Sequence, residues 1–175
     1  MNKPIITQEE VKKLLDYNPE TGNLIWKRRD CAPASWNTKF AGKIAGSMTL
    51  ANGYMKIGIN NISYLQHRII WVWVYGYLPE KEVDHINRVR HDNRLINLRE
   101  ANPAQNRQNR SKSSNNTSGI TGVIYAKHHG KYHARIKVNG KSNHLGCFFT
   151  REEAIKARRE AEGKYFGKFR NQGVK

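Results

Sequence analysis

The stretch RSKSSNNTSG (110–119) interrupts the chain with polar and small residues and contains no apolar one. Such segments are typical of linkers, because they cannot bury enough apolar surface to fold. The 175-residue chain is long enough for one ordinary domain or two small ones. We therefore expect two small domains, at residues 1–110 and 119–175, joined by a linker at residues 111–118.

The net charge of +17 comes from 31 lysines and arginines against 14 acidic residues. Both halves share this excess: 18 basic and 10 acidic residues precede Ser113, and 13 basic and 4 acidic residues lie from there to the end. Clustered positive charge favours nucleic acid as a partner, because its phosphates release counterions on binding. A membrane surface is the rival, but the sequence has no long apolar run and no basic amphipathic helix.

The number and spacing of the cysteines indicate in which cellular compartment the protein folds. Only two cysteines occur, Cys31 and Cys147, far apart in the chain. This excludes a disulfide framework and a four-cysteine zinc site. The N-terminal MNKPIITQEEVKKLL has no apolar signal core. We therefore expect a reduced, cytoplasmic monomer with no membrane partner.

Local signals predict the elements of the first half. Thr7, with Glu10 three residues later, predicts a capped helix over residues 7–15. Asn60-Asn61 predicts the tip of a hairpin. The apolar HRIIWVWVYGYLP (67–79) favours a buried helix, although its β-branched and aromatic residues also suit a strand. Its tryptophans, Trp71 and Trp73, are expected in the core rather than as platforms for stacking bases.

The segment VDHINRVRHDNRLINLREANPAQNRQN (83–109) carries the candidate chemistry. Its pattern predicts a short strand at 83–86, a loop, a second strand at NLREA and a helix that begins at Asn102-Pro103, with asparagine at the N-cap and proline at N1. Strand, loop, strand and helix form a compact frame. This frame can bring Asp84, His85 and Asn106 together.

Hydrolysis of a phosphodiester needs parts that this segment can supply. A neutral imidazole such as that of His85 can activate water near pH 7. A hard divalent cation needs oxygen ligands, and the Asp84 carboxylate and the Asn106 amide oxygen are of that type. The basic residues of the segment can hold the DNA backbone; they are Arg88, Arg90, Arg94, Arg99, Arg107 and Arg110.

Asp84-His85, Asn97 and Asn106 resemble the HNH endonuclease motif, in the phage homing-endonuclease version where asparagine replaces the last histidine. The resemblance runs from about Tyr17 to Asn109, and HRIIWVWVYG and DNRLINLREANPAQN are its most specific segments. It implies a ββα-metal fold with one magnesium or manganese ion, ligated by Asp84 and Asn106. It also implies that His85 is the general base, and that Asn97 holds the loop and orients His85 through a backbone hydrogen bond.

Some polar residues of this region also suit structural or surface roles that involve no catalysis. Asn97 alone also suits ordinary turn chemistry, and Asn106 could be a solvated helix residue. His91 is expected at the surface, where it could contact a phosphate, and Asp92 and Asn93 are expected to shape the loop. For the pair His67-Arg68 packing and DNA contact both stay open.

The second half predicts a three-stranded antiparallel sheet with one helix packed on it. The strands are GITGVIYAK, KYHARIKV and KSNHLGCFF, with turns at His129-Gly130 and Asn139-Gly140. Thr150, with Glu153 completing a capping box, begins the helix TREEAIKARREAEGKYFG. A stripe of small residues lets this helix lie close to the sheet: Ala154, Ala157 and Ala161.

Alternation assigns the faces of the middle strand: Ala134, Ile136 and Val138 should face the helix, and His133, Arg135 and Lys137 should face out. SGITGV, KYHARIKV and LGCFFTREEAIKARREAEGKYFG resemble the APETALA2-type DNA-binding domain, which lays its sheet into the major groove. The resemblance places Ile124, Ala126, Ser142 and His144 on the outer face as well. Plant members carry arginines at Ile124 and Ala126 and tryptophan at His144, so a base preference does not transfer. The alternative is that Arg135 and Lys137 only solvate the sheet.

The sequence thus predicts an α+β chain: a ββα-metal nuclease module followed by a three-stranded sheet with one helix. The predicted function is a divalent-metal-dependent endonuclease of double-stranded DNA, of the homing type and, if phage-encoded, active in the cytoplasm of a bacterial host. A non-catalytic DNA-binding regulator with a decayed HNH fold is the alternative. An RNA-binding protein is weaker, because no stacking motif of the known RNA modules is found.

Overall fold

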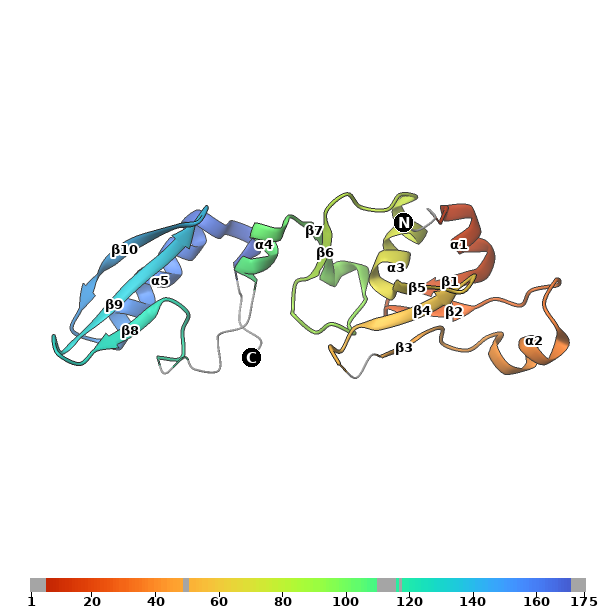
Figure 1. Ribbon diagram of the computed structural model, residues 1–175, viewed down its shortest axis with the longest axis horizontal. Coiled ribbons are helices and arrows are strands. Elements are labelled where there is room, and N and C mark those ends of the chain that lie inside the picture. Colours follow the sequence, from red (N-terminus) through yellow and green to blue (C-terminus); the bar gives the residue numbers. More distant parts are fainter. Residues whose placement is uncertain (1–5, 49–50, 110–115, 117, 171–175) are drawn as a thin grey trace. The chain divides into compact units, whose positions relative to one another are not determined.

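The computed structural model describes residues 6–48, 51–109, 116 and 118–170. The chain mixes helices and strands, as predicted, and divides into two compact units, Met1–Ala101 and Asn102–Lys175 (Figure 1). This division lies earlier than the predicted end of the first domain at residue 110, because the helix after Asn102 groups with the second unit. The predicted linker, 111–118, lies mostly outside the described residues.

The first unit is built from short helices and antiparallel hairpins. Its elements are α1 (Gln8–Leu14), β1 (Leu15–Asn18), β2 (Asn23–Trp26), α2 (Ala34–Phe40), β3 (Ser47–Met48), β4 (Met55–Ile59), β5 (Ile62–Leu65), α3 (Gln66–Tyr75), β6 (Glu82–His85), the 3₁₀ turn η1 (Leu95–Asn97) and β7 (Leu98–Ala101). The strands pair as β1-β2, β3-β4-β5 and β6-β7. The β4–β5 turn has positive φ at both Asn60 (50°) and Asn61 (61°), the conformation of a tight hairpin turn, as predicted.

The apolar segment after residue 66 is a helix, α3, so the choice between helix and strand is settled. It packs on α1 and on the β4–β5 hairpin (Figure 1). Its Ile69, Ile70 and Val72 are fully buried in the core of the unit. The helix ends at Gly76, whose φ of 84° is the left-handed conformation that glycine adopts most readily.

Both tryptophans of α3 belong to the core region, as predicted. Trp71 is 7% exposed and lies within the core cluster. Trp73 packs against that cluster, and its indole N–H donates to the carbonyl of Leu15 at 3.0 Å. This bond fastens α3 to the start of β1.

The helix α2 was not predicted from the sequence. It follows Pro33 without a side-chain capping bond, and only Asn37 among its residues is buried. A helix with neither a cap signal nor an apolar stripe leaves little pattern to read.

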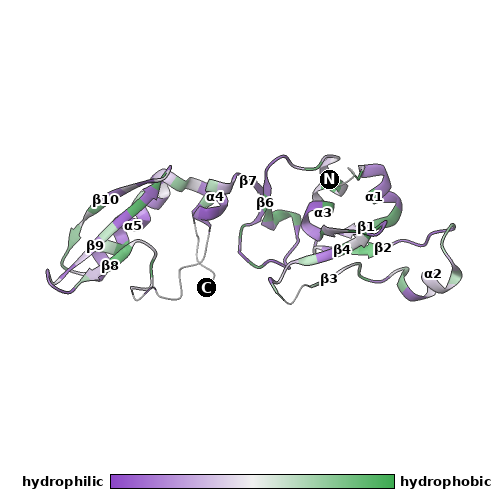
Figure 2. Cartoon of the chain, in the orientation of Figure 1, coloured by the Kyte–Doolittle hydropathy of each residue, from purple (hydrophilic) through white to green (hydrophobic). Residues whose placement is uncertain are grey.

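Past α3, the predicted strands and helix are confirmed as elements. β6 and β7 pair antiparallel, with Asp84 opposite Arg99 and His85 opposite Leu98. The helix α4 (Pro103–Gln108) begins the second unit. Its N-cap is Asn102, which forms a capping box with Gln105. α4 is mostly hydrophilic (Figure 2) and contains no buried residue.

The remainder of the second unit is the predicted sheet and helix. β8 (Val123–Ala126), β9 (Lys131–Val138) and β10 (Lys141–Phe148) form an antiparallel sheet in the order β10-β9-β8. The turn between β9 and β10 has positive φ at Asn139 (49°) and Gly140 (83°), as predicted for this dipeptide. The register of β9 and β10 shifts between His144 and Gly146, which marks a bulge.

The helix α5 (Arg151–Phe166) covers one face of this sheet, and the 3₁₀ turn η2 (Gly167–Phe169) follows it. Thr150 and Glu153 form the predicted capping box. Ala154 and Ala161 are buried against the sheet, and Ala157 is half-buried.

A buried guanidinium joins this helix to the sheet. Arg158 is 5% exposed. It donates from Nη1 to the carbonyl of Arg135 on β9 and from Nε to Glu162. The charged group therefore has partners on both elements that enclose it.

No helix within the described residues is long and apolar enough to cross a membrane. Cys31 and Cys147 are both free and exposed.

Candidate active site around Asp84 and His85

The β6–β7 hairpin places Asp84 and His85 side by side at the end of a short strand. Both residues are buried, with exposed fractions of 7% for Asp84 and 3% for His85. Such burial of two ionisable neighbours requires partners within the fold. Each residue has a different one.

Asp84 is paired with Arg99. The two residues lie opposite each other in the β6–β7 register. Arg99 donates to Asp84 Oδ2 from Nε at 3.0 Å and from Nη2 at 2.8 Å. Their side chains are 8% exposed for Asp84 and 11% for Arg99, so this is a largely buried ion pair. Arg99 was predicted to hold the DNA backbone; in this structure it holds the Asp84 carboxylate, and its contact with DNA stays a prediction.

His85 is held through its imidazole by a chain of amides. His85 Nε2 lies 2.9 Å from Asn93 Oδ1. Asn93 Nδ2 donates to Gln66 Oε1 at 2.8 Å, and Gln66 Nε2 donates to the carbonyl of Ala45 at 2.9 Å. Asn93 and Gln66 are each 1% exposed. From the sequence, Asn93 was expected only to shape the loop.

The direction of this chain of amides fixes the tautomer of His85. The carbonyl of Ala45 can only accept, so the Gln66 amide nitrogen points to it and the Gln66 oxygen accepts from Asn93. The Asn93 oxygen then accepts from His85 Nε2–H. In the neutral imidazole the basic lone pair is consequently on Nδ1. Burial lowers the pKa of His85 below its usual range, against the raising effect of the bond to Asn93, which favours this neutral form at pH 7.

A second histidine, His67, lies against His85. The ring centroids are 4.9 Å apart and the rings are nearly perpendicular, with Tyr54 within 6 Å of both. His67 is 3% exposed, and burial together with the neighbouring His85 and Arg68 lowers its pKa to about 3. Its Nδ1 is buried with no hydrogen-bond partner among the described residues. The first turn of α3 thus supplies both Gln66 and His67 to the site.

The pair His67-Arg68 is engaged within the unit. His67 packs on His85, and Arg68 Nη2 donates to the carbonyl of Pro79 at 3.3 Å. Packing is therefore the arrangement that the structure gives to the pair. His91, by contrast, is exposed, as predicted.

Asn97 braces the loop between the two strands. Its Oδ1 accepts from the backbone of Asn87 at 2.9 Å, and its Nδ2 donates to the carbonyl of Asp92 at 2.8 Å. Its backbone carbonyl accepts from Ile86, the residue after His85, at 2.9 Å. Asn97 therefore holds the loop and the end of β6, whereas the ring of His85 is held by Asn93.

Two more residues fasten this loop to the rest of the unit. The Tyr17 hydroxyl donates to the carbonyl of Asn93 at 3.1 Å and accepts from the backbone of Leu95 at 2.9 Å. Gly22 lies so close that an added Cβ would be 2.5 Å from the backbone nitrogen of Arg94. The β1–β2 hairpin therefore packs directly on the loop that carries Asn93.

The predicted phosphate contacts of the first half differ in their surroundings. Arg94 forms a bidentate pair with Asp92, at 2.7 and 2.6 Å, and this pairing lowers the pKa of Asp92 to about 2. Arg90 donates to the carbonyl of Asn52 and is exposed. Arg88 is half-buried, with a positive φ of 67°. Arg107 is exposed on α4, and Arg110 lies outside the described residues.

Asn106, the second predicted metal ligand, is half-buried on α4. Because α4 belongs to the second unit, the pairing of Asn106 with Asp84 stays a prediction, as does the ββα arrangement. Among the described residues, no group of three or more His, Cys, Asp or Glu could hold a metal ion. A site made of one carboxylate and one amide falls outside that description, and a magnesium ion that keeps several waters needs only one or two protein carboxylates.

The residues predicted for the outer sheet face of the second unit lie next to one another on β9 and β10. Arg135 pairs with His144, and Lys137 with Ser142, in the β9–β10 register. The rings of His133 and His144 lie 5.9 Å apart. Arg135, Lys137 and His144 are exposed and His133 is half-buried, whereas Ala134 and Ile136 on the helix side are fully buried. The face assignment is confirmed, and contact with DNA stays a prediction.

Comparison with known proteins bears on the first site. A family model described as HNH endonuclease matches residues 64–108, which include Gln66, His67, Asp84, His85 and Asn93. Residues 64–108, the HNH-like region, are thus similar to HNH endonucleases, and the match supports a nuclease. The chain matched no curated protein and no solved structure in the same comparisons.

Within the HNH-like region the sequence revealed the acid-histidine pair but not the residues that hold the histidine. Asn93 sits in a loop full of polar residues, and Gln66 lies at the start of an apolar helix. The one available signal was that helix start, since a glutamine and a histidine precede an otherwise apolar run. Polar residues on a buried helix need partners, which points to a site.

Proposed function

We propose that this protein is a metal-dependent endonuclease that hydrolyses phosphodiester bonds of double-stranded DNA. The observation that supports it most is the His85 imidazole, held by Asn93 with its basic lone pair on Nδ1, beside the Asp84 carboxylate. The match of the HNH-like region to an endonuclease model supports the same reaction class. The homing type is proposed from the resemblance alone.

In this mechanism His85 is the general base. Its Nδ1 takes a proton from water, and the water oxygen then attacks the phosphorus of the scissile phosphate. The ring becomes an imidazolium, whose Nε2–H stays bonded to the Asn93 oxygen. Because that oxygen is anchored through Gln66, the ring keeps its orientation while its charge changes.

A divalent cation, magnesium or manganese, is the proposed cofactor. When bound, it would neutralise charge on the scissile phosphate and on the leaving oxygen. The Asp84 carboxylate fits as a ligand because it is a hard oxygen donor next to the proposed base. Asn106 is proposed as the second ligand. Arg99, through its bond to Asp84 Oδ2, orients the carboxylate.

The grip on DNA is proposed to come from both units. Before the predicted linker the proposed phosphate contacts are Arg88 and Arg90 of the first unit and Arg107 and Arg110 of the second, with Arg94 and Arg99 secondary because each is paired with an acid. In the second unit we propose the outer sheet face with His133, Arg135, Lys137 and His144, in the manner of APETALA2-type domains. The net charge of +17 supports a polyanionic partner.

The alternative is a DNA-binding regulator that does not cut. The buried Asp84–Arg99 pair favours it, since this pair occupies the carboxylate that the nuclease needs for its cation. Under this alternative, neither the wild-type protein nor Asp84→Asn cuts DNA, and both bind it.

Plasmid nicking decides between the two functions. We expect the full-length protein to nick or linearise supercoiled plasmid with magnesium or manganese and to leave it intact in EDTA. His85→Ala and Asp84→Asn should each lose activity but keep DNA binding. A wild-type protein that cuts no DNA, its own gene's flanking sequence included, would establish the non-catalytic alternative. Cutting by His85→Ala at the wild-type rate would remove His85 as the base.

A further inference from the structure

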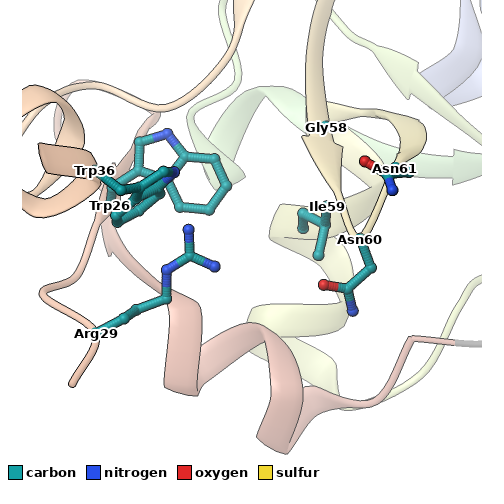
Figure 3. A pocket seen from close by; sticks show the side chains of 7 residues that line it. All are labelled: Trp26, Arg29, Trp36, Gly58, Ile59, Asn60 and Asn61. Carbon is teal, nitrogen blue, oxygen red and sulfur yellow. The ribbon is translucent and has the colours of Figure 1, made fainter. Parts of the chain in front are cut away.

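A pocket of about 310 Å³ opens in the first unit, away from Asp84 and His85 in the sequence (Figure 3). Its lining is unusual in composition: Trp26, Arg29, Trp36, Gly58, Ile59, Asn60 and Asn61. Figure 3 shows the two tryptophan rings and the Arg29 guanidinium on one side and the tip of the β4–β5 hairpin on the other. The nuclease mechanism uses none of these residues.

The aromatic wall is held in place before any ligand arrives. The rings of Trp26 and Trp36 meet edge to face, with centroids 5.6 Å apart. The Arg29 guanidinium lies 3.5 Å from the centroid of Trp36. Asn37, which is buried, accepts from the backbone N–H of Arg29 and donates to its carbonyl. A wall fixed in this way loses little conformational freedom on binding.

The polar groups at the pocket still have capacity to bind. Arg29 lines the pocket and brings a positive charge to it. Across from it, Asn60 and Asn61 are exposed at the hairpin tip. An amide carries both donors and acceptors, as the edges of nucleobases do. The pocket therefore combines tryptophan rings, a cation that lies on the face of Trp36, and amides.

The volume of the pocket and the net positive charge of the chain indicate which class of ligand the pocket binds. The volume lies at the lower end of the roughly 300–1,000 Å³ range of small-ligand pockets, which suits one nucleobase. Tryptophan and arginine are side chains on which unstacked bases stack. We propose that this pocket binds one unstacked, extrahelical base of the DNA. The proposal rests on the proposed function insofar as the ligand is DNA.

β4 gives the spacing between this pocket and the active site. Tyr54, just before β4, contacts the His85 ring, and Asn60, just after it, lines the pocket. The strand has five residues, which span about 17 Å. B-DNA rises about 3.4 Å per nucleotide along each strand. The pocket and the His85 ring therefore lie at the two ends of β4, and the length of this strand corresponds to about five nucleotides of one DNA strand.

The test uses duplexes that carry one bulged 2-aminopurine, compared with fully paired duplexes of the same sequence, and the full-length protein in EDTA. Because no cutting is needed, failure of the nuclease function, read from plasmid nicking, is distinguishable from failure of this proposal. We expect wild type to bind the bulged duplex about tenfold more tightly, with quenching of the 2-aminopurine fluorescence by stacking. Equal affinity for the two duplexes overturns the proposal.

Variants locate the effect at the pocket. Trp36→Leu and Arg29→Gln should abolish the preference for the bulged duplex. Lys13→Gln, at an exposed residue of α1, is the charge-matched control for Arg29→Gln. It should weaken binding to the bulged and to the fully paired duplex by the same factor. Asn60→Gly keeps the positive φ of the turn and removes only the amide, so it tests the pocket even if Trp36→Leu fails to fold. A preference that survives in Asn60→Gly and Arg29→Gln contradicts the site.

Discussion

At the scale of single residues, the candidate base depends on a partner that has no acid-base chemistry of its own. Asn93 Oδ1 accepts from His85 Nε2–H, and Gln66 prevents the Asn93 amide from turning round, because a reversed amide would set the Asn93 oxygen against the Gln66 oxygen, two acceptors with no hydrogen between them. An imidazole without this anchor could exchange tautomers. The position of the proton is thus fixed at a distance, by the carbonyl of Ala45.

Substitution of Asn93 tests this dependence. Asn93→Ala should lower the nicking rate by roughly 10²-fold, because the ring is no longer oriented for proton transfer. Asn93→Asp should instead raise the pKa of His85, since a carboxylate favours the imidazolium. The acidic limb of the pH–rate profile then moves to higher pH. Asn143→Ala, an exposed asparagine on β10, is the control. An unchanged profile in Asn93→Asp would rule out the bond.

His67 makes the stability of the first unit depend on pH. Burial lowers its pKa from 6.5 to about 3, so between these values the unfolded chain binds a proton that the folded chain does not. The contribution of His67 to the free energy of unfolding should therefore be fully present above pH 6.5. It should fall by about 1 kcal/mol per pH unit as the pH drops towards 3.

Thermal unfolding at a series of pH values measures this effect. His67→Phe keeps an aromatic ring at the site and removes the titration, so its melting temperature should fall less than that of wild type between pH 6.5 and about pH 4. His91→Phe, at an exposed histidine, is the control and should follow wild type. Parallel curves for wild type and His67→Phe would show that His67 does not titrate in this range.

At the scale of helices and strands, local signals predicted the elements well. Side chains cap three helices at Thr7, Asn102 and Thr150, the positions that the sequence indicated. The turns at Asn60-Asn61 and Asn139-Gly140 are likewise set by residues that tolerate positive φ. Such features depend on a few neighbouring residues, so the sequence is sufficient to find them.

The site residues that escaped prediction depend on contacts between distant parts of the chain. Tyr17 reaches Asn93 from β1, and Gln66 reaches it from α3. Neither the spacing nor the type of these residues reveals the pairing, because any buried polar group needs some partner. The sequence pointed to Asp84 and His85 because they are adjacent, but it held no signal for the residues that fix them.

The contact between α5 and its sheet rests in part on one buried arginine. Arg158 donates to the carbonyl of Arg135 and to Glu162, which is itself partly exposed. Arg158→Met should destabilise the second unit by about 2 kcal/mol, because the carbonyl no longer has its buried donor. Arg159→Met, at the exposed neighbouring position, should change stability by less than about 0.5 kcal/mol. Urea unfolding measures the two variants. Equal unfolding midpoints for Arg158→Met and Arg159→Met would refute this role of Arg158.

At the scale of the whole molecule, charge is spread over both units but is not equally available. Arg94 and Arg99 of the first unit are paired with acids, whereas Arg135 and Lys137 lie exposed on one sheet face. An ion pair within the protein must be given up, or shared, before its arginine can neutralise a phosphate. We therefore expect the exposed sheet face of the second unit to supply more of the DNA affinity than its share of the net charge indicates.

The salt dependence of DNA binding tests this division in the full-length chain. Each neutralised phosphate adds about −0.9 to the slope of log affinity against log salt. The double variant Arg135→Gln, Lys137→Gln should bind more weakly, with a slope that is shallower by about 0.9 for each phosphate that it no longer neutralises. The double variant Lys156→Gln, Arg159→Gln removes the same charges from exposed positions of α5 and should keep nearly the wild-type slope. If both variants flatten the slope equally, the sheet face binds no phosphate and acts only through the overall charge of the chain.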